Sequence, residues 1–248
     1  MSNLLSNKNA ILLRRFYDAL IAAYGPQHWW PSETALETVV GAYLTQNTSW
    51  RNVERSVANL KNAGVLTIPG LRAVADEDLR TLIRPSGYMV RKGAAIKAFI
   101  ALLDARYGGS LEQMAASPVT ENREAMLALP GVGPETADAI LLYALAAPVM
   151  VVDEYLRRVV TRHGLIDERA RYTDVQQLAL DAFAEDEPAT LLAHYNEFHA
   201  LIVAVGKTHC GGVPRCVDCP LNQPRFAPPA IPQAAPRIRS SQTRKAFA

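Results

Sequence analysis

The chain has 248 residues, with 26 Lys and Arg against 24 Asp and Glu, a formal net charge of +2, and 49% hydrophobic residues. This composition is that of an ordinary globular protein and excludes disorder of the whole chain. No apolar run reaches the roughly 18 residues that a membrane-spanning helix needs, and residues 1–10 lack the apolar core of a secretory signal. We therefore expect a cytoplasmic protein without a membrane partner. A net charge near zero gives no whole-chain indication of an anionic partner.

Apolar residues recur at intervals of three and four along most of residues 8–207, which is the period of amphipathic helices. Pro and Gly, as at Gly25-Pro26 and Pro69-Gly70, interrupt the pattern and leave helices of about ten to fifteen residues. Thr34 with Glu37 three residues on has the spacing of a capping box, which predicts a helix start. No run alternates as a strand would. The predicted fold class is all-α.

Residues 45–49 (Thr-Gln-Asn-Thr-Ser) follow an apolar helical segment and precede Trp50. Small polar side chains at this place indicate a turn between two helices, with Asn47 or Ser49 as the N-cap of the second. The alternative interpretation is that these side chains point outward into a cleft.

Residues 125–137 have the features of two helices joined by a tight turn. Pro130-Gly131-Val132-Gly133 forms the turn, and Pro134 suits the first position of the next helix. Gly131 and Gly133 permit positive φ and close backbone approach, and Val132 fills the gap between the helices. The N–H groups at the start of the second helix would then form an anion site.

Asp153 ends the apolar run Val149-Met150-Val151-Val152, twenty residues after Gly133. A carboxylate that follows four hydrophobic residues is expected at the mouth of an apolar cleft, where a catalytic role is possible. It also suits the N-cap of a helix that starts at Glu154, and the two roles are compatible.

Leu129-Pro-Gly-Val-Gly133, followed by residues 136–139 (Thr-Ala-Asp-Ala) and Val151-Val152-Asp153, resembles the helix-hairpin-helix DNA glycosylases of the endonuclease III superfamily. The resemblance runs from about residue 28 to Leu221. It implies two helical domains with the active-site cleft between them: residues 1–33 plus 147–223 form one, and residues 34–146, with the hairpin at 124–145, form the other. The hairpin, including Thr136, would grip the DNA backbone while a flipped nucleotide enters the cleft near Asp153.

Glu135 stands where the bifunctional members of this superfamily carry the lysine that attacks the sugar and nicks the strand. A carboxylate forms no Schiff base, and the flanking Pro134 and Thr136 offer no amine in its place. AP lyase chemistry is therefore not expected from this hairpin.

Further segments resemble the 3-methyladenine DNA glycosylases of the superfamily, namely residues 28–31, 45–50, 84–88, 135–141 and 149–153. That branch also lacks the hairpin lysine, and it stacks the damaged base between aromatic side chains. The matching residues here are Trp29, Trp30 and Trp50, for which core packing is the competing interpretation. The implied activity is hydrolysis of the N-glycosidic bond of alkylated purines such as 3-methyladenine, in base excision repair.

The resemblance implies functions for three more residues. Gln46 matches the glutamine that fills the space left by the flipped nucleotide, and Tyr88 stands where a residue wedges into the opposite strand. Lys207 matches a pocket lysine, with a solvated helix-end lysine as the competing interpretation. The implied partner is double-stranded DNA containing damaged bases, bound by a monomer in the cytoplasm or at the bacterial nucleoid.

All three cysteines, Cys210, Cys216 and Cys219, lie within ten residues of one another. Many superfamily members bind a [4Fe–4S] cluster through Cys-x6-Cys-x2-Cys-x5-Cys, whereas here the first interval is five residues and Arg225 stands at the fourth position. The loop 209–221 is therefore vestigial, or holds a cluster with a non-cysteine fourth ligand, or binds zinc through His209 and the cysteines. The implied chemistry requires no cofactor.

Residues 224–248 are rich in proline and contain five basic residues and no acidic one. This composition predicts a disordered basic tail. These five charges leave residues 1–223 at −3. The tail is either a solubilising terminus or a phosphate tether that acts at low salt.

Two other functions are compatible with the same residues. One is an endonuclease III-like glycosylase and AP lyase for oxidised pyrimidines, with Lys207 as its amine. The other is a DNA-binding protein without catalysis, in which Asp153 only caps a helix.

Overall fold

The computed structural model describes residues 2–226, so most of the predicted tail lies outside the described residues. The described chain folds into α-helices and short 3₁₀ segments without a strand, which confirms the all-α prediction. None of the described helices combines the length and apolar character needed to cross a bilayer. The helices are α1 (Ser2–Tyr24), α2 (Ala35–Leu44), α3 (Trp50–Asn62), α4 (Ile68–Ala73), α5 (Asp76–Leu82), η1 (Arg84–Ser86), α6 (Met89–Tyr107), α7 (Leu111–Ala115), α8 (Val119–Leu127), α9 (Pro134–Tyr143), α10 (Glu154–Arg162), α11 (Tyr172–Ala182), α12 (Pro188–Thr208) and η2 (Pro224–Phe226).

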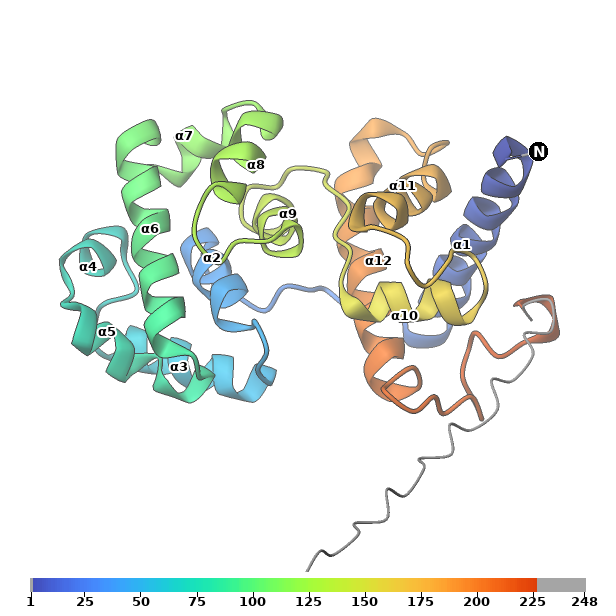
Figure 1. The fold of residues 1–248 in the computed structure, drawn as a ribbon, viewed down its shortest axis with the longest axis horizontal. Coiled ribbons are helices and arrows are strands. Elements are labelled where there is room, and N and C mark those ends of the chain that lie inside the picture. The colour runs from blue at the N-terminus through green and yellow to red at the C-terminus, as the bar shows by residue number, and fades with distance from the viewer. Residues whose placement is uncertain (1, 227–248) are drawn as a thin grey trace, which may run out of the picture.

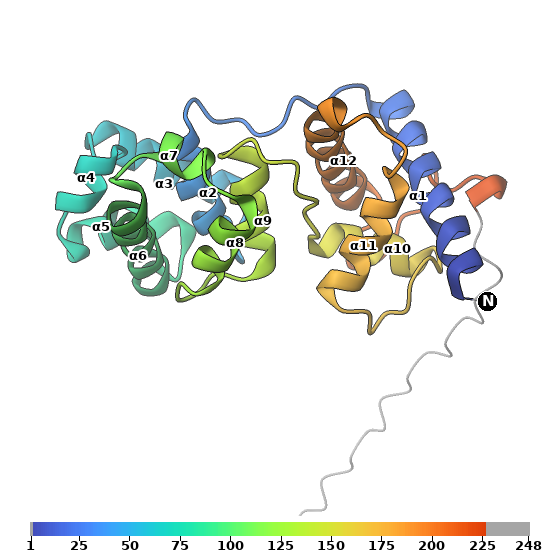
Figure 2. The same cartoon turned by 90° about the horizontal axis from the view of Figure 1, so that it is seen from above.

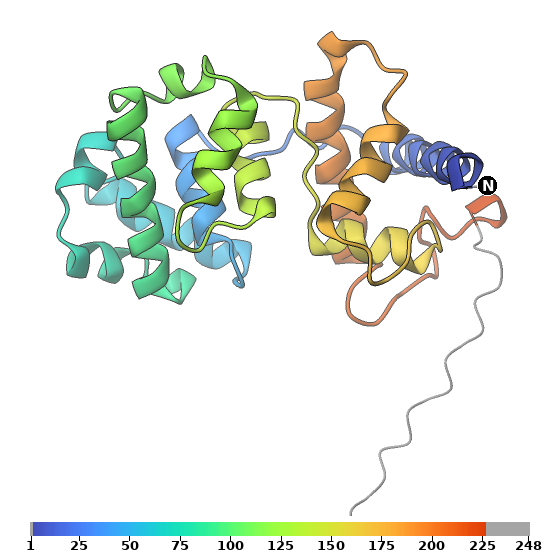
Figure 3. The same cartoon turned by 45° about the horizontal axis from the view of Figure 1, so that its top comes forward.

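The helices form two groups that lie next to each other (Figure 1). Helices α2 to α9 make up the central lobe, and α1 with α10 to α12 makes up the terminal lobe. The chain crosses between the lobes twice, after α1 and after α9, and the views in Figures 2 and 3 show the same two crossings. The terminal lobe is therefore discontinuous in sequence. The domain boundaries at 33/34 and 146/147 stay predictions.

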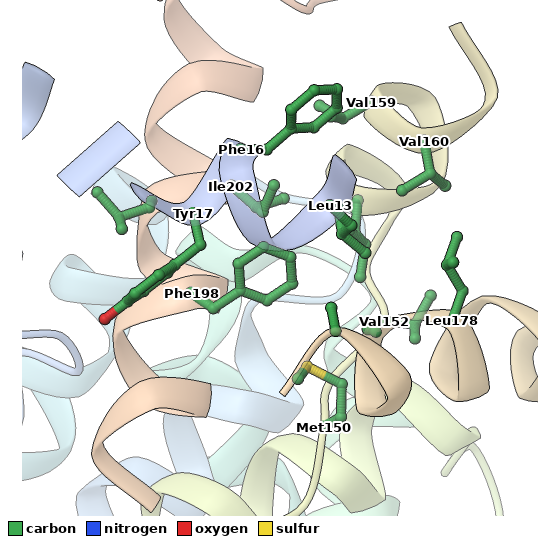
Figure 4. Close-up of a cluster of buried hydrophobic side chains, with 14 of the residues drawn as sticks. Leu13, Phe16, Tyr17, Met150, Val152, Val159, Val160, Leu178, Phe198 and Ile202 are labelled. Carbon is green, nitrogen blue, oxygen red and sulfur yellow. The ribbon is translucent and has the colours of Figure 1, made fainter. Parts of the chain in front are cut away.

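Each lobe has a hydrophobic core of its own. Figure 4 shows part of the terminal core, in which Leu13 and Phe16 of α1 meet Phe198 and Ile202 of α12. Helix α9 serves both cores: Ala137, Ile140 and Leu141 belong to the central one, and Ala139 and Leu142 to the terminal one. Because α9 is the second helix of the hairpin, the hairpin is fixed to both lobes by buried apolar surface.

Helix α2 begins where the capping box at Thr34 predicted, with one difference in the hydrogen bonds. Thr34 is the N-cap of α2, and its side chain accepts a hydrogen bond from the backbone N–H of Glu37 at 3.1 Å. The Glu37 carboxylate accepts from the N–H of Glu33 at 3.1 Å, one residue before the position that a capping box requires. The reason is its second partner, because Glu37 also pairs with Lys61 of α3 at 2.9 Å.

Helices α10 and α12 approach each other closely at Gly206. A Cβ atom at this position would lie 2.2 Å from Cδ1 of Tyr155 and 2.7 Å from its Cβ, so the clash involves the stem of the side chain. Gly206→Ala is therefore expected to lower the free energy of unfolding by about 1–3 kcal/mol, because α10 must move away from α12.

Thermal or chemical unfolding of the variant measures this loss, and Gly93→Ala in α6 is the matched control. A Cβ atom at Gly93 has its nearest neighbour at 3.7 Å, an ordinary contact, so alanine there is expected to cost nothing. Equal stabilities for the two variants would contradict the close packing of Tyr155 on Gly206.

Candidate active site

A cavity of about 600 Å³ lies where the two lobes meet. It is bounded by Trp29 and Trp30, the loop between α2 and α3, the start of α9, the segment around Asp153, and α12. The lining residues include Trp29, Trp30, Gln46, Trp50, Glu135, Thr136, Asp153, Tyr155, His199 and Lys207. The fold thus brings into one cavity side chains that lie more than 170 residues apart in the sequence.

The three tryptophans form a contiguous aromatic wall of this cavity. The rings of Trp30 and Trp50 meet edge to face with centroids 5.3 Å apart, and Trp29 lies 6.0 Å from Trp30 and 6.5 Å from Trp50. Trp30 also packs on Tyr143 at 5.2 Å. The rings are inclined to one another by 61–84°, so they form no common plane, but the flat face of a single indole ring suits stacking of a flat ligand.

Asp153 caps α10 and reaches the cavity at the same time. Its Oδ1 accepts a hydrogen bond from the N–H of Leu156 at 2.7 Å, and its Oδ2 lies 3.6 Å from Nε2 of His199. The residue is only 6% exposed. One carboxylate oxygen is thus tied to the helix, while the other faces the cavity wall formed by α12.

His199 lines the cavity and Tyr143 contacts it from outside the lining, and the sequence analysis singled out neither residue. The Tyr143 hydroxyl lies 2.6 Å from Nδ1 of His199, and its other contact is the Asn196 carbonyl at 3.4 Å. When Tyr143 donates to Nδ1, the ring carries its proton on Nε2, on the side of Asp153. The spacing of α12 contained a signal, because His199, Val203 and Lys207 recur every fourth residue and therefore share one helix face.

Glu135 lies in the first turn of α9 and also lines the cavity, and the residue as a whole remains exposed to solvent. Enclosure by the cavity wall raises its pKa to about 7, with further raising effects from the negative charges of Asp153 and Glu154 and an opposing effect from His199. Two carboxylates thus face the same space. Near neutral pH one of them is partly protonated.

Replacing Glu135 with glutamine is expected to stabilise the protein more at alkaline than at acidic pH. The carboxyl group titrates at 4.5 in an unfolded chain and at about 7 in the folded one. As the pH rises through this window, the unfolded state releases its proton first, so the wild type loses stability relative to the variant. Above this window the difference stays constant. Thermal melts across the pH range measure it, and parallel curves for the two proteins would contradict the raised pKa.

Lys207 faces the aromatic wall. Its Nζ lies 5.2 Å from the centroid of the Trp29 ring, a cation–π contact. The lysine is thus a cavity residue, and the face of Trp29 already accommodates a positive charge.

The hairpin has the expected turn, with one difference. Gly131 adopts a φ of +78°, which favours glycine, whereas Gly133 has a φ of −100° and is the N-cap of α9. Backbone conformation therefore requires glycine at only one of the two positions. Val132 is half-buried against the central core, and the first N–H groups of α9 have no acceptor within their own helix.

Gln46 connects the loop after α2 to the hairpin. Its Nε2 donates to the carbonyl of Gly131 at 3.1 Å and to the hydroxyl of Thr136 at 3.0 Å. Ser49 occupies the N-cap of α3 without a side-chain hydrogen bond, and the polar residues 45–49 line the cavity. In this loop the cleft interpretation therefore describes the side chains better than the capping one.

Tyr88 lies outside the cavity lining and is 62% exposed, at the N-cap of α6. The buried Lys92 fixes this region to the cavity loop, because its Nζ donates to the carbonyls of Leu44 at 2.9 Å and Ser86 at 2.8 Å. Burial lowers the pKa of Lys92. The end of α2, which leads to Gln46, and the turn before Tyr88 are thus held together.

Comparison with known proteins agrees with this geometry. The model of the HhH-GPD superfamily of base excision DNA repair proteins matches residues 40–185, more than half of the chain. The chain belongs to this superfamily. A Methanocaldococcus jannaschii protein named as a candidate DNA repair glycosylase is 39% identical over 213 residues, which are 86% of this chain and 94% of that protein.

Solved structures show the same architecture. The H. pylori 3-methyladenine DNA glycosylase bound to 1,N6-ethenoadenine has a TM-score of 0.70 at 28% identity, covering 79% of this chain and 97% of that one. Endonuclease III in a non-covalent complex with DNA has a TM-score of 0.70 at 23% identity over 84% of this chain and 91% of that one, and shares the fold. The protein is thus a base excision DNA glycosylase by family, with its cavity between two lobes.

The cysteine loop of this glycosylase is organised by arginine side chains. Arg162 donates to Sγ of Cys210 at 3.1 Å and to the carbonyls of the next two residues at 2.7 and 2.9 Å. Arg158 donates to the carbonyl of Cys210 at 3.0 Å. Nδ1 of His209 lies 3.0 Å from the carbonyl of Arg215.

Within residues 2–226, no group of three or more His, Cys, Asp and Glu side chains is placed to hold a metal ion. As placed in the described part of the chain, Cys210, Cys216, Cys219 and His209 do not form a ready ligand set for an iron–sulfur or zinc centre. The metal site stays a prediction, which iron and zinc analysis of the purified protein tests directly.

Proposed function

We propose that this glycosylase is monofunctional and removes alkylated purines such as 3-methyladenine from double-stranded DNA by hydrolysis. The observation that carries the proposal is the composition of the cavity: three indole rings line one side, the Asp153 carboxylate faces it, and Glu135 stands where the superfamily resemblance places the lyase lysine. The ethenoadenine held by the H. pylori relative is an alkylated purine, which supports the same substrate class.

The indole wall selects for the chemistry of such bases. A purine methylated at a ring nitrogen carries a positive charge, and an electron-rich ring attracts it by about 0.5–2 kcal/mol more than a neutral base. The Lys207 ammonium on the Trp29 face marks a place where a cation is accepted. A base that stacks there takes over the position of this ammonium.

The reaction then needs little acid catalysis of base departure. When the bond between the base nitrogen and the sugar breaks, its electron pair neutralises the positive charge of the base, and an oxocarbenium-like sugar remains. The negative charge of Asp153 stabilises this cation, and the carboxylate accepts a proton from the water that attacks the sugar. The products are the free base and an abasic site. The Leu156 N–H holds the carboxylate in place during these steps.

The lyase alternative depends on Lys207, because its amine lines the same cavity. An amine that attacks the sugar forms a Schiff base, which borohydride converts into a stable protein–DNA adduct. We expect no adduct, and we expect the abasic product to remain unbroken until alkali is added. Strand cleavage without alkali, together with a borohydride adduct that Lys207→Met abolishes, would replace this proposal by the lyase mechanism.

A further inference from the structure

Asp138 is a completely buried carboxylate in the second helix of the hairpin, and its relative exposure is 0%. Arg123 of α8 donates two hydrogen bonds to it, from Nε to Oδ1 at 2.6 Å and from Nη2 to Oδ2 at 3.1 Å. Oδ2 also accepts from the Tyr172 hydroxyl at 2.7 Å and from Nε2 of Gln176 at 3.0 Å, both on α11. Four donors from three side chains therefore converge on one buried group, and they come from both lobes.

Two members of this cluster also hold the segment that leads to Asp153. The Tyr172 hydroxyl accepts from the backbone N–H of Val152 at 3.2 Å, and Gln176 donates to the carbonyl of Met150 at 2.7 Å. The side chains of Met150 and Val152 are packed in the terminal core (Figure 4). Side-chain packing and two backbone hydrogen bonds thus fix the residues directly before Asp153.

The charges and protonation states in the cluster favour a single arrangement of its hydrogen bonds. Burial and the Asp138 charge raise the pKa of Tyr172 far above its ordinary value, so the phenol stays protonated and donates. The hydrogen bonds that Arg123 donates to Asp138 raise the pKa of Arg123, which stays charged. A buried ion pair that is fully hydrogen-bonded gives a defined geometry, because the loss of one partner leaves the other charge unpaired.

The hairpin end of the cluster is close to the expected DNA contact. Asp138 lies two residues after Thr136, which accepts a hydrogen bond from Gln46 and lines the cavity. Arg123 lies on the first hairpin helix. The cluster therefore connects both hairpin helices, in the central lobe, to residues 150–152 and α11 of the terminal lobe.

From this arrangement we propose that Asp138 is a positioning residue for the glycosylase reaction: through Tyr172 and Gln176 it holds Asp153 at a fixed place relative to the hairpin that grips the DNA. This inference rests on the proposed function, in which the Asp153 carboxylate acts on the sugar and the attacking water. A reacting sugar held by the hairpin meets the carboxylate only if this distance is maintained. Displacement of such a group by about 1 Å lowers rates by about 100-fold.

Tyr172→Phe is the sharpest test, because it removes one hydroxyl and keeps the ring in the core. We expect its single-turnover rate of 3-methyladenine release to fall by about 10- to 100-fold. We also expect unchanged affinity for duplex DNA with a tetrahydrofuran abasic analogue, and faster hydrogen exchange at the Val152 amide. Asp138→Asn, which keeps the shape and removes the charge, is expected to show the same pattern.

Tyr107→Phe is the matched control, because Tyr107 donates a buried hydrogen bond to Oδ1 of Asn122 at 2.8 Å in the central lobe. A merely structural role for Tyr172 would lower the melting temperatures of both variants and leave both rates unchanged. That result, with unaltered exchange at Val152, would overturn the inference. If Asp138→Asn does not fold, Tyr172→Phe alone decides.

An incorrect proposed function would be recognised by a different result, namely the absence of base release by the wild type. If the wild type releases no alkylated base, Asp153 loses its assigned role, and the part of the inference that concerns catalysis is overturned with it. Hydrogen exchange at Val152 then tests the structural connection on its own. Faster exchange in Tyr172→Phe supports it, and equal exchange overturns it.

Discussion

Replacement of Asp153 by asparagine is expected to lower the single-turnover rate of base release by about 100- to 10,000-fold. An amide carries no negative charge to stabilise the sugar cation, and it accepts no proton from the attacking water. The fold should survive, because asparagine is as good an N-cap as aspartate and its side-chain oxygen can accept from the Leu156 N–H. The change therefore separates the chemical role of Asp153 from its role in capping α10.

Quenched-flow or manual sampling under excess enzyme measures this rate, and the affinity for abasic-analogue DNA checks that the variant still binds. Asp104→Asn is a suitable control, because Asp104 is a carboxylate that pairs with Arg72 on the surface of the central lobe. Base release by Asp153→Asn at the wild-type rate would mean that the residue only caps the helix.

Replacement of Trp29 by leucine is expected to lower kcat/KM for release of damaged bases by roughly 5- to 150-fold, because one stacking face is lost. This loss corresponds to about 1–3 kcal/mol of binding free energy. Trp29→Phe is expected to separate stacking from charge attraction. Phenylalanine keeps an aromatic face but attracts cations less strongly than tryptophan. The variant should therefore lose more activity on cationic 3-methyladenine than on neutral 1,N6-ethenoadenine.

The two substrates provide the control within one experiment, because folding or active-site concentration affects both equally. Release of each base is followed by chromatography at matched enzyme concentration. Equal losses on both bases would mean that Trp29 contributes stacking alone, and full activity of Trp29→Leu on both would place the ring outside the base site.

The sequence predicted the helical fold and the hairpin because both depend on local chemistry. Periodic apolar residues define the helices, and the left-handed conformation at Gly131 follows from a short turn between two of them. The assembly of Trp29, Trp50, Asp153 and Lys207 in one cavity was predicted through family resemblance, since no local pattern relates residues so far apart.

Other features depended on packing between distant segments, which the sequence does not reveal. Asp138 gave no sign of its partners, because Tyr172 and Gln176 lie on α11 in the other lobe. Helix α12 carries two histidines, His194 and His199, and a histidine in an apolar helix is usually a core residue, so the sequence did not reveal that His199 lines the cavity and contacts Tyr143. The raised pKa of Glu135 likewise follows from enclosure in the cavity and from the charge of Asp153.

The central claim is that this cavity excises alkylated purines by hydrolysis. The most direct measurement is chromatography of the bases released when the full-length protein is incubated with duplex DNA that carries radiolabelled methyl groups. The account predicts release of 3-methyladenine by the wild type, release slower by about 100-fold or more by Asp153→Asn, and intact strands in both cases until alkali is added. Absence of labelled 3-methyladenine from the wild-type reaction, with the DNA bound, would contradict it.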